Sequence, residues 1–140
     1  MMDLLRAFYW FDEALQAGLR RHGWTDITRS QSLILSNLAF GVRRASVLAR
    51  NLGVTRQAIS QMLGEMERKG LISIGADPSD GRAQIVSFSH ESRKLREDAM
   101  HVLNEIEREL TAKLGQRKFK ALSSVLASDW GPALFTTEPA

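Results

Sequence analysis

The sequence predicts a mainly α-helical fold with one small β-hairpin near its middle. Apolar residues recur at steps of three and four over most of the chain, as they do in amphipathic helices. Between residues 71 and 89 the period changes to two, which indicates strands. Only three prolines interrupt the 140 residues, so long helices are permitted. This length suits a single domain over residues 1–140.

Two helices are expected at the start of the chain. Residues 4–21 form the first, because their apolar side chains have the spacing of one helix face. Ser30 can cap the second, since a serine hydroxyl accepts backbone N–H groups at a helix start. Gly41 marks the expected end of that helix.

Two further helices are expected to meet at a tight turn that contains Gly53. The first of them begins at residue 45 or 46 and ends at Leu52, where a glycine at positive φ would stop it. Thr55 is a good N-cap for the second, which is expected to end at Gly70. The apolar stripe of this second helix consists of Ala58, Ile59, Met62, Leu63 and Met66.

The other face of the helix after Thr55 carries side chains that form hydrogen bonds. These side chains are Arg56, Gln57, Ser60 and Gln61. Such a face fits the major groove of DNA, where arginine can bind guanine and glutamine can bind adenine. Thr55 is expected to contact the phosphate backbone. An ordinary solvated helix face is the alternative, and this helix alone does not exclude it.

The predicted hairpin favours the DNA-binding interpretation. Residues 71–74 and 83–89 are expected to be its strands, joined by a long polar tip over residues 75–81. Arg82 follows the tip and can enter a minor groove, where narrow A·T tracts concentrate negative potential. Asp80 can orient the Arg82 guanidinium. A polar turn with a surface arginine is the alternative, but a helix-turn-helix followed at once by a basic hairpin is far less likely by chance than either element alone.

Positive charge is concentrated in the middle of the chain. Residues 43–96 contain ten Lys and Arg against five Asp and Glu, a balance of +5 where the whole chain has +3. Arg43, Arg44 and Arg68 are therefore weaker candidates for contacts with DNA phosphates.

Two helices are expected after the hairpin. The first covers residues 91–114, and the second follows Gly115 and ends near Trp130. Together with residues 4–21 they carry more apolar side chains than a central lobe of some forty residues can cover. The terminal helices are therefore expected to form a homodimer, whose two lobes would read a pseudo-palindromic site.

Several short motifs resemble those of one family. The helix-turn-helix pattern lies in Leu48-Ala49 and Leu52-Gly53-Val54, and the D-x-R wing signature lies in Asp77–Arg82 with Val86 and Phe88-Ser89. Over nearly the whole chain the sequence resembles the MarR family of transcription regulators. It departs from the family at Phe88-Ser89, where Leu-Thr is usual, and near Ser92, where a glycine is usual. The resemblance implies a winged helix-turn-helix lobe at about residues 30–90, with dimerisation helices at about 1–22 and 91–130.

An aromatic cluster is expected near the N-terminus. Its members are Phe8, Tyr9, Trp10, Phe11 and Trp24. The resemblance implies an effector pocket between the dimer helices and the lobes, which Phe8, Trp10, Phe11 and Trp24 could line for a small lipophilic or aromatic anion. Plain core and dimer packing is the favoured alternative, because aromatic residues at helical spacing are usually core residues.

Other classes of function lack support in the sequence. Without cysteine there are no disulfides, thiolate zinc sites or thiol sensors, and the three isolated histidines form no metal-binding motif. No catalytic or cofactor motif is present. Neither a signal peptide nor an apolar run of ~20 residues is found, so a cytoplasmic protein is expected. The sequence thus predicts a sequence-specific double-stranded DNA-binding regulator, a homodimeric repressor that a small molecule could release. A winged-helix protein-interaction module and a non-specific architectural DNA binder are the alternatives.

Overall fold

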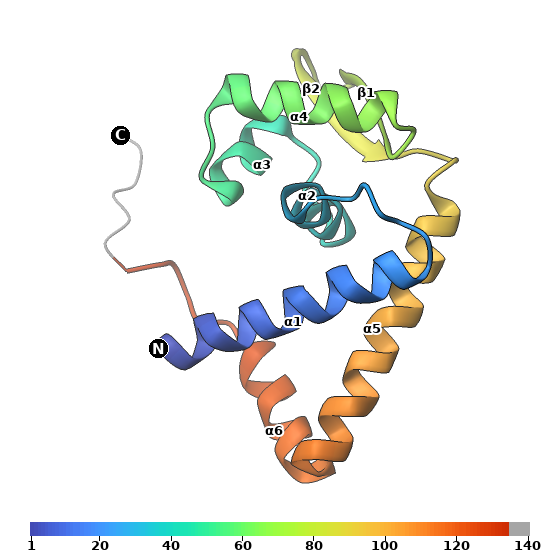
Figure 1. Cartoon of the computed structure of the whole chain (residues 1–140). Helices are drawn as coiled ribbons and strands as arrows, with labels where there is room; N and C mark the ends of the chain where they lie inside the picture. The colour runs from blue at the N-terminus through green and yellow to red at the C-terminus, as the bar shows by residue number, and fades with distance from the viewer. Residues whose placement is uncertain (135–140) are drawn as a thin grey trace. The chain divides into compact units, whose positions relative to one another are not determined.

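A computed structural model describes residues 1–134 of the chain (Figure 1). The chain divides into two compact units, Met1–Leu103 and Asn104–Ala140. The described residues form six helices and one two-stranded antiparallel sheet, so the predicted mainly helical fold with a small β-wing is confirmed. None of these helices is both long and apolar enough to cross a membrane.

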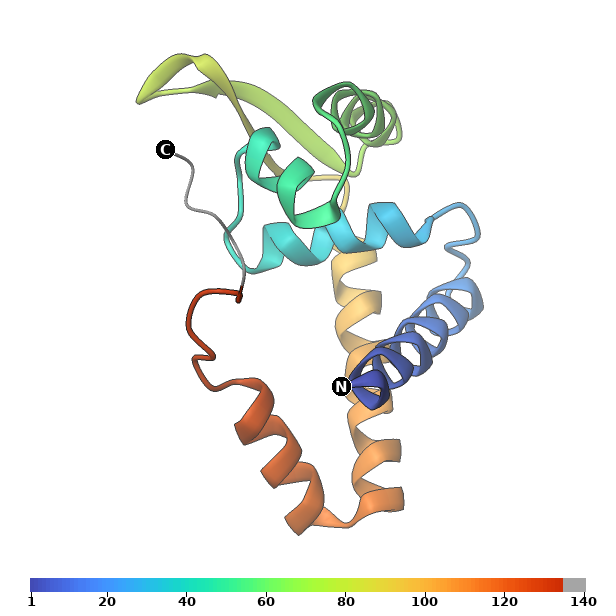
Figure 2. The same ribbon diagram turned by 90° about the vertical axis from the view of Figure 1, so that its left-hand side faces the viewer.

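The first unit builds a lobe on top of its N-terminal helix. Its elements are α1 (Met2–Arg21), α2 (Arg29–Ala39), α3 (Ala45–Leu52), α4 (Arg56–Arg68), β1 (Ile72–Asp77) and β2 (Asp80–Phe88). Figures 1 and 2 show α2 between α1 and a layer that consists of α3, α4 and the hairpin. A fifth helix, α5 (Arg93–Leu114), begins in this unit and ends in the second.

The start of α2 differs from the prediction. Its N-cap is Thr28, whose hydroxyl accepts the Gln31 backbone N–H at 3.2 Å, while the Gln31 side chain accepts the Thr28 N–H at 3.1 Å. Ser30 therefore lies inside the helix and the prediction that it caps α2 was wrong. The physical reason is the reciprocal capping box, which Thr28 can form because a glutamine follows three residues later.

The turn between α3 and α4 has the predicted geometry. Gly53 ends α3 with φ 67°, a left-handed conformation that costs glycine little. Thr55 caps α4, and its hydroxyl accepts the Ala58 backbone N–H at 3.1 Å. The stripe of α4 that faces the lobe is buried at Ile59, Leu63 and Met66. The predicted stripe is thus confirmed at its centre, whereas Ala58 and Met62 at its margin remain partly exposed.

The hairpin has longer strands and a shorter loop than predicted. β1 pairs with β2 from Ile72 opposite Phe88 to Ala76 opposite Gln84, with an irregularity before Asp77 opposite Asp80. Only Pro78 and Ser79 remain as the loop. The prediction of a long polar tip over residues 75–81 was therefore wrong. Asp77 accounts for the tight turn, because its carboxylate accepts both the backbone N–H (2.8 Å) and the hydroxyl (2.7 Å) of Ser79.

The core of the first unit draws on every layer. Its most deeply buried side chains are Leu19, Ile34, Leu38, Leu48, Ile59, Leu63, Met66, Ile72, Val86, Leu95 and Val102. Helix α1 closely approaches α5 at Gly18, where an added Cβ would lie 2.3 Å from Val102 Cγ1. Gly18 thus gives the two helices a close contact that no larger residue would permit.

A serine joins the hairpin to α5. The Ser89 hydroxyl donates to the Gly70 carbonyl and accepts the Ser92 backbone N–H at 3.1 Å. The Ser92 hydroxyl in turn donates to the Ser89 carbonyl at 2.8 Å. Serine therefore satisfies the backbone groups at the point where the sequence departs from the family pattern.

The second unit contains the last helix. Helix α6 (Gln116–Leu126) follows Gly115, which has φ 83°, and ends four residues before Trp130. Its apolar side chains Leu122, Val125 and Leu126 are exposed in the single chain. These residues form a surface that this unit does not itself cover.

Candidate nucleic-acid interface

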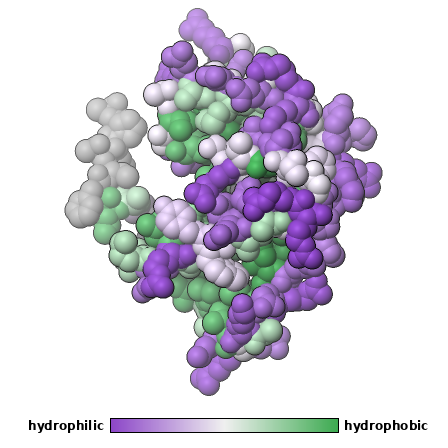
Figure 3. Space-filling model, viewed as in Figure 1, coloured by the Kyte–Doolittle hydropathy of each residue, from purple (hydrophilic) through white to green (hydrophobic). Residues whose placement is uncertain are grey.

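Four of the predicted site residues lie together on the outer face of α4. Arg56, Gln57, Ser60 and Gln61 are all exposed, on the side of α4 away from its buried stripe. On the face drawn in Figure 3, hydrophilic side chains predominate at the outer edge of the lobe, where α4 and the hairpin lie. The exposed face of α4 therefore carries hydrogen-bonding side chains and one cation, while the opposite face is packed against the lobe.

Thr55 and Arg68 lie at opposite ends of this helix. The Thr55 oxygen is used as an acceptor in the cap, while a hydroxyl also carries one donor hydrogen that a phosphate oxygen could accept. Arg68 is exposed at the last residue of α4, about 18 Å along the helix axis from Arg56. The two residues therefore mark the ends of an exposed helix surface.

The wing carries Arg82 in an exposed position on β2. Asp80 Oδ1 accepts the backbone N–H of Arg82 at 3.1 Å. The carboxylate thus acts on the backbone next to the side chain, and not on the guanidinium as expected. A supported backbone with an exposed cation leaves Arg82 able to reach a ligand beyond the tip of the lobe.

Arg44 has a partner that the sequence did not reveal. Its Nη2 lies 2.9 Å from Asp77 Oδ2, and the Asp77 side chain is only 4% exposed while that of Arg44 is 51% exposed. The hydroxyl and N–H of Ser79, followed by the Arg44 guanidinium, hold the pKa of Asp77 below its ordinary value of 3.8. Arg44 therefore anchors the turn of the hairpin, and half of its side chain remains available to solvent.

The segment before α3 also pairs with the free edge of β2. The Val86 N–H donates to the Arg43 carbonyl at 2.8 Å, and Arg44 forms a bridge with Ile85. The Arg43 side chain is exposed. The backbone of Arg43 and Arg44 thus extends the hairpin by one short antiparallel contact, which brings both arginines beside the wing.

The predicted aromatic cluster does not lie in one place. Phe8, Trp10 and Phe11 are exposed in the first half of α1, and the Phe8 and Tyr9 rings lie 5.9 Å apart. Trp24 follows the other end of α1, about 15 Å or more from Phe11 along the helix. These residues therefore cannot all line one small pocket within a single chain.

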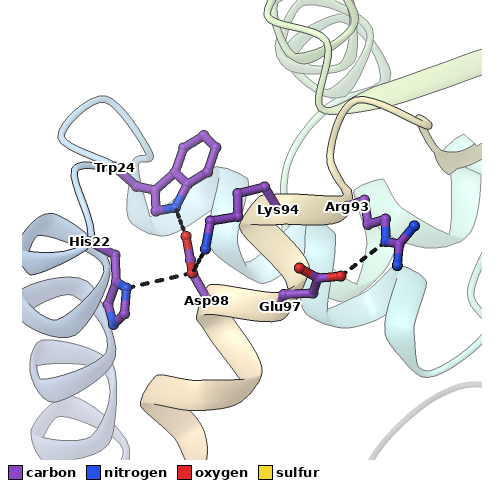
Figure 4. A network of polar contacts seen from close by, with 6 residues as sticks. All are labelled: His22, Trp24, Arg93, Lys94, Glu97 and Asp98. Atoms are coloured by element: carbon purple, nitrogen blue, oxygen red, sulfur yellow. Dashed lines mark hydrogen bonds and ion pairs between the residues drawn. The ribbon is translucent and has the colours of Figure 1, made fainter.

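Trp24 belongs to a polar network with α5 (Figure 4). Asp98 accepts from Trp24 Nε1 at 2.9 Å and from Lys94 Nζ at 2.7 Å, and His22 Nδ1 lies 3.5 Å from the same carboxylate. Lys94 is the main reason that the pKa of Asp98 is below its ordinary value of 3.8, and the Trp24 hydrogen bond contributes. The His22 and His101 rings meet edge to face at 5.6 Å.

The same network does not resemble a metal centre. Among residues 1–134, no three His, Cys, Asp or Glu side chains are placed to hold a metal ion. Figure 4 shows the Lys94 ammonium group beside Asp98. An adjacent ion pair joins Arg93 to Glu97 at 3.0 Å. The network ties the end of α1 to α5.

Comparisons with known proteins agree with this architecture. Residues 25–83 match the model of the MarR family. No curated protein matches the chain. Among solved structures, a probable transcriptional regulator from Pseudomonas aeruginosa is 25% identical, with 89% of this chain and 91% of that chain covered and a TM-score of 0.64.

Two other solved structures share the fold at lower identity. Wild-type MarR from E. coli is 22% identical, with 90% of this chain and 93% of that chain covered and a TM-score of 0.68. NadR, solved in complex with 4-hydroxyphenylacetate, is 23% identical, with 90% and 88% covered and a TM-score of 0.70. The described residues therefore have the winged helix-turn-helix fold of these structures, and residues 25–83 are similar to the MarR family.

Proposed function

We propose that this protein is a sequence-specific double-stranded DNA-binding transcription regulator. The observation that carries the proposal is the exposed polar face of α4, with Arg56, Gln57, Ser60 and Gln61 on a helix whose other face is buried. In the major groove this face would read base edges. Arg82 would enter the adjacent minor groove, while Thr55, Arg43 and Arg68 would contact phosphates.

We further propose that the regulator is a homodimer and acts as a repressor. Exposed apolar side chains on α1, among them Leu4, Leu5 and Phe8, and on α6 support a protein interface, because an isolated chain would leave them in water. A two-fold dimer would present two copies of α4 to half-sites about one helical turn apart. Sedimentation equilibrium at micromolar concentration is expected to show a dimer, and a monomer would count against this proposal.

A small-molecule effector is the third part of the proposal. Arg29 lies over the Tyr9 ring with its guanidinium carbon 5.6 Å from the ring centroid, and it forms an ion pair with the buried Asp12. The Arg29 side chain is 53% exposed, so a cation and an aromatic surface are both available to an aromatic carboxylate. The NadR complex with 4-hydroxyphenylacetate supports this class of ligand.

Fluorescence titration tests the effector directly. Aromatic and lipophilic acids, 4-hydroxyphenylacetate included, are expected to change the emission of Trp10, one helical step from Tyr9, and Arg29→Gln is expected to abolish the change. Trp10→Phe separates this signal from those of Trp24 and Trp130. If no acid in the panel alters the emission, the effector proposal is withdrawn while the DNA-binding proposal stands.

Selection from a random duplex pool, followed by anisotropy titration, tests DNA binding. We expect a pseudo-palindromic winner that binds ~10³-fold or more tightly than scrambled DNA. Arg82→Ala should weaken binding and reduce the slope of log K against log salt by about one unit. The matched control is Arg21→Ala, which removes an exposed arginine from the end of α1.

The same experiment separates the two alternatives. An architectural DNA binder would bind selected and scrambled duplexes alike and lose affinity for both in parallel as salt rises. A protein-interaction module would bind neither at moderate salt. The polar face of α4 argues against the second alternative, because protein hot spots are rich in buried aromatic anchors.

A further inference from the structure

Helix α4, the recognition helix of the proposed function, contacts the wing directly through one carboxylate. Glu67 lies near the end of α4, and its Oε2 accepts the backbone N–H of Ile74 in β1 at 2.8 Å. Seven residues separate the two, and Gly70, with φ 74°, lies in the turn between them. The contact therefore joins two elements that would both touch DNA under the proposed function.

The position of Ile74 in the hairpin explains why its N–H needs a partner. Ile74 lies opposite Val86, and the Val86 N–H points away from β1 toward the Arg43 carbonyl. The two residues are thus a non-hydrogen-bonded pair, whose backbone groups point outward from the hairpin. Among the described residues no strand covers the outer edge of β1. Glu67 takes the place of such a strand at this point.

The charge of Glu67 is unfavourable for a surface that meets DNA. It is exposed beside Arg68 and Lys69, within a segment whose balance is +5. A carboxylate there would be repelled by phosphates, so a direct contact of Glu67 with DNA is unfavourable. Its hydrogen bond to the wing is the contact that the structure shows.

The hydrogen bond between Glu67 and Ile74, called the brace below, lies close to Arg82, the residue that would enter the minor groove. Ala76 is two residues beyond Ile74 in β1 and pairs with Gln84 of β2, and Arg82 precedes Gln84 by two residues, nearer to the turn. Two residues of strand correspond to about 7 Å, so a small change of angle at Ile74 moves the tip and displaces Arg82. A two-stranded ribbon has little resistance of its own to such movement.

We propose that Glu67 is a positioning residue, which fixes the angle of the wing on the recognition helix so that Arg82 reaches the minor groove while α4 occupies the major groove. This inference rests on the proposed function. It assigns to Glu67 a role through Arg82 and no contact with DNA.

A comparison of two neutral variants removes the charge from the test. Glu67→Ala and Glu67→Gln both delete the carboxylate, but glutamine keeps a side-chain oxygen that can accept the Ile74 N–H. Binding of both variants to the selected duplex is measured by anisotropy, with Arg82 present and in the Arg82→Ala background. Thermal unfolding of all variants is followed in parallel, so that a loss of fold is recognised.

We expect Glu67→Ala to bind about five-fold more weakly than Glu67→Gln when Arg82 is present, a ratio within the range of one hydrogen bond. In the Arg82→Ala background the two are expected to bind within about two-fold of each other, because the brace then has nothing to position. Two results would overturn the proposal. One is equal affinity of Glu67→Ala and Glu67→Gln when Arg82 is present, and the other is a difference between them that persists in the Arg82→Ala background.

Hydrogen exchange at Ile74 provides a readout that does not depend on DNA. Exchange of this amide should accelerate in Glu67→Ala and stay slow in Glu67→Gln. Unchanged exchange in Glu67→Ala would refute the brace even if DNA affinity fell. If the parent protein binds no duplex, the proposed function fails and the role in positioning Arg82 falls with it, and the exchange rate alone then reports whether the contact exists.

Discussion

The same substitution at two helix-interior glycines should change stability in opposite directions. Gly18 lies within α1 and Gly64 within α4. Replacing either with alanine removes up to about 1 kcal/mol of helix-propensity cost. At Gly64 the added Cβ would meet only Arg68 Nη1 at 3.4 Å, the end of a flexible side chain, so Gly64→Ala should stabilise the protein by up to ~1 kcal/mol.

At Gly18 the geometry reverses the sign. The added Cβ would lie 2.3 Å from Val102 Cγ1 and 2.9 Å from Val102 Cγ2, whereas carbon atoms in contact are about 3.5–4.0 Å apart. Val102 is only 2% exposed and β-branched, so it has little freedom to rotate away. Overpacking of this kind costs about 1–3 kcal/mol, and an approach of 2.3 Å places Gly18→Ala in the upper part of that range, at about 2–3 kcal/mol. A net loss of roughly 1–2 kcal/mol then remains after a gain of about 1 kcal/mol in propensity.

Urea unfolding followed by circular dichroism, at one fixed protein concentration, measures both variants. In a thermal melt of the same variants, a loss of 1–2 kcal/mol would lower the melting temperature by roughly 3–8 °C. Val102→Ala should make room for the new methyl group, so Gly18→Ala should cost less in that background than alone. If Gly18→Ala were as stabilising as Gly64→Ala, the close approach of α1 and α5 inferred from Gly18 would be refuted.

Two further predictions concern the ion pairs. Because the pKa of Asp98 is lowered in the folded protein, its contribution to the free energy of unfolding is present above its ordinary pKa of 3.8 and is lost as the pH falls below it. Asp98→Asn should therefore flatten the dependence of that free energy on pH below about pH 4, as measured by urea titrations at several pH values, and an unchanged dependence would contradict this. Arg44→Ala should speed amide exchange in the hairpin, since it leaves the buried Asp77 without its cation. Slower DNA association with unchanged hairpin exchange would instead mean that Arg44 serves only phosphates.

Features set by neighbouring residues were predicted well from the sequence. Gly53 and Thr55 act within one turn of their own helices, so a left-handed glycine and a hydroxyl cap could be inferred from their positions alone. At α2 two hydroxyl residues competed, and the sequence signal that decides between them is Gln31, three residues after Thr28. The prediction of Ser30 was wrong because it considered the hydroxyl alone and not the glutamine that completes the capping box.

Features set by contacts between distant segments were not predictable in the same way. The sequence placed Asp77 in the wing, but Asp77 and Arg44 are 33 positions apart in the chain. Their pairing depends on how the hairpin packs against the segment before α3. The strands run further than their composition suggests, because cross-strand pairing overrides the weak strand preference of Gly75 and Ala76. Trp24 was predicted to belong to an aromatic cluster, and only the path of α5 reveals its hydrogen bond to Asp98.

Contacts between distant segments also stabilise the hairpin, which would be only marginally stable alone. An isolated two-stranded hairpin is marginally stable in water, and both of its edges expose unpaired backbone groups. Here β2 is held at its outer edge by the Arg43 carbonyl, while Glu67 of α4 holds the outer edge of β1. One contact comes from the segment that leads into α3 and the other from α4, so the wing is held at both of its outer edges. The part of the hairpin beyond these contacts is short and carries Arg82, so the position of Arg82 follows that of α4.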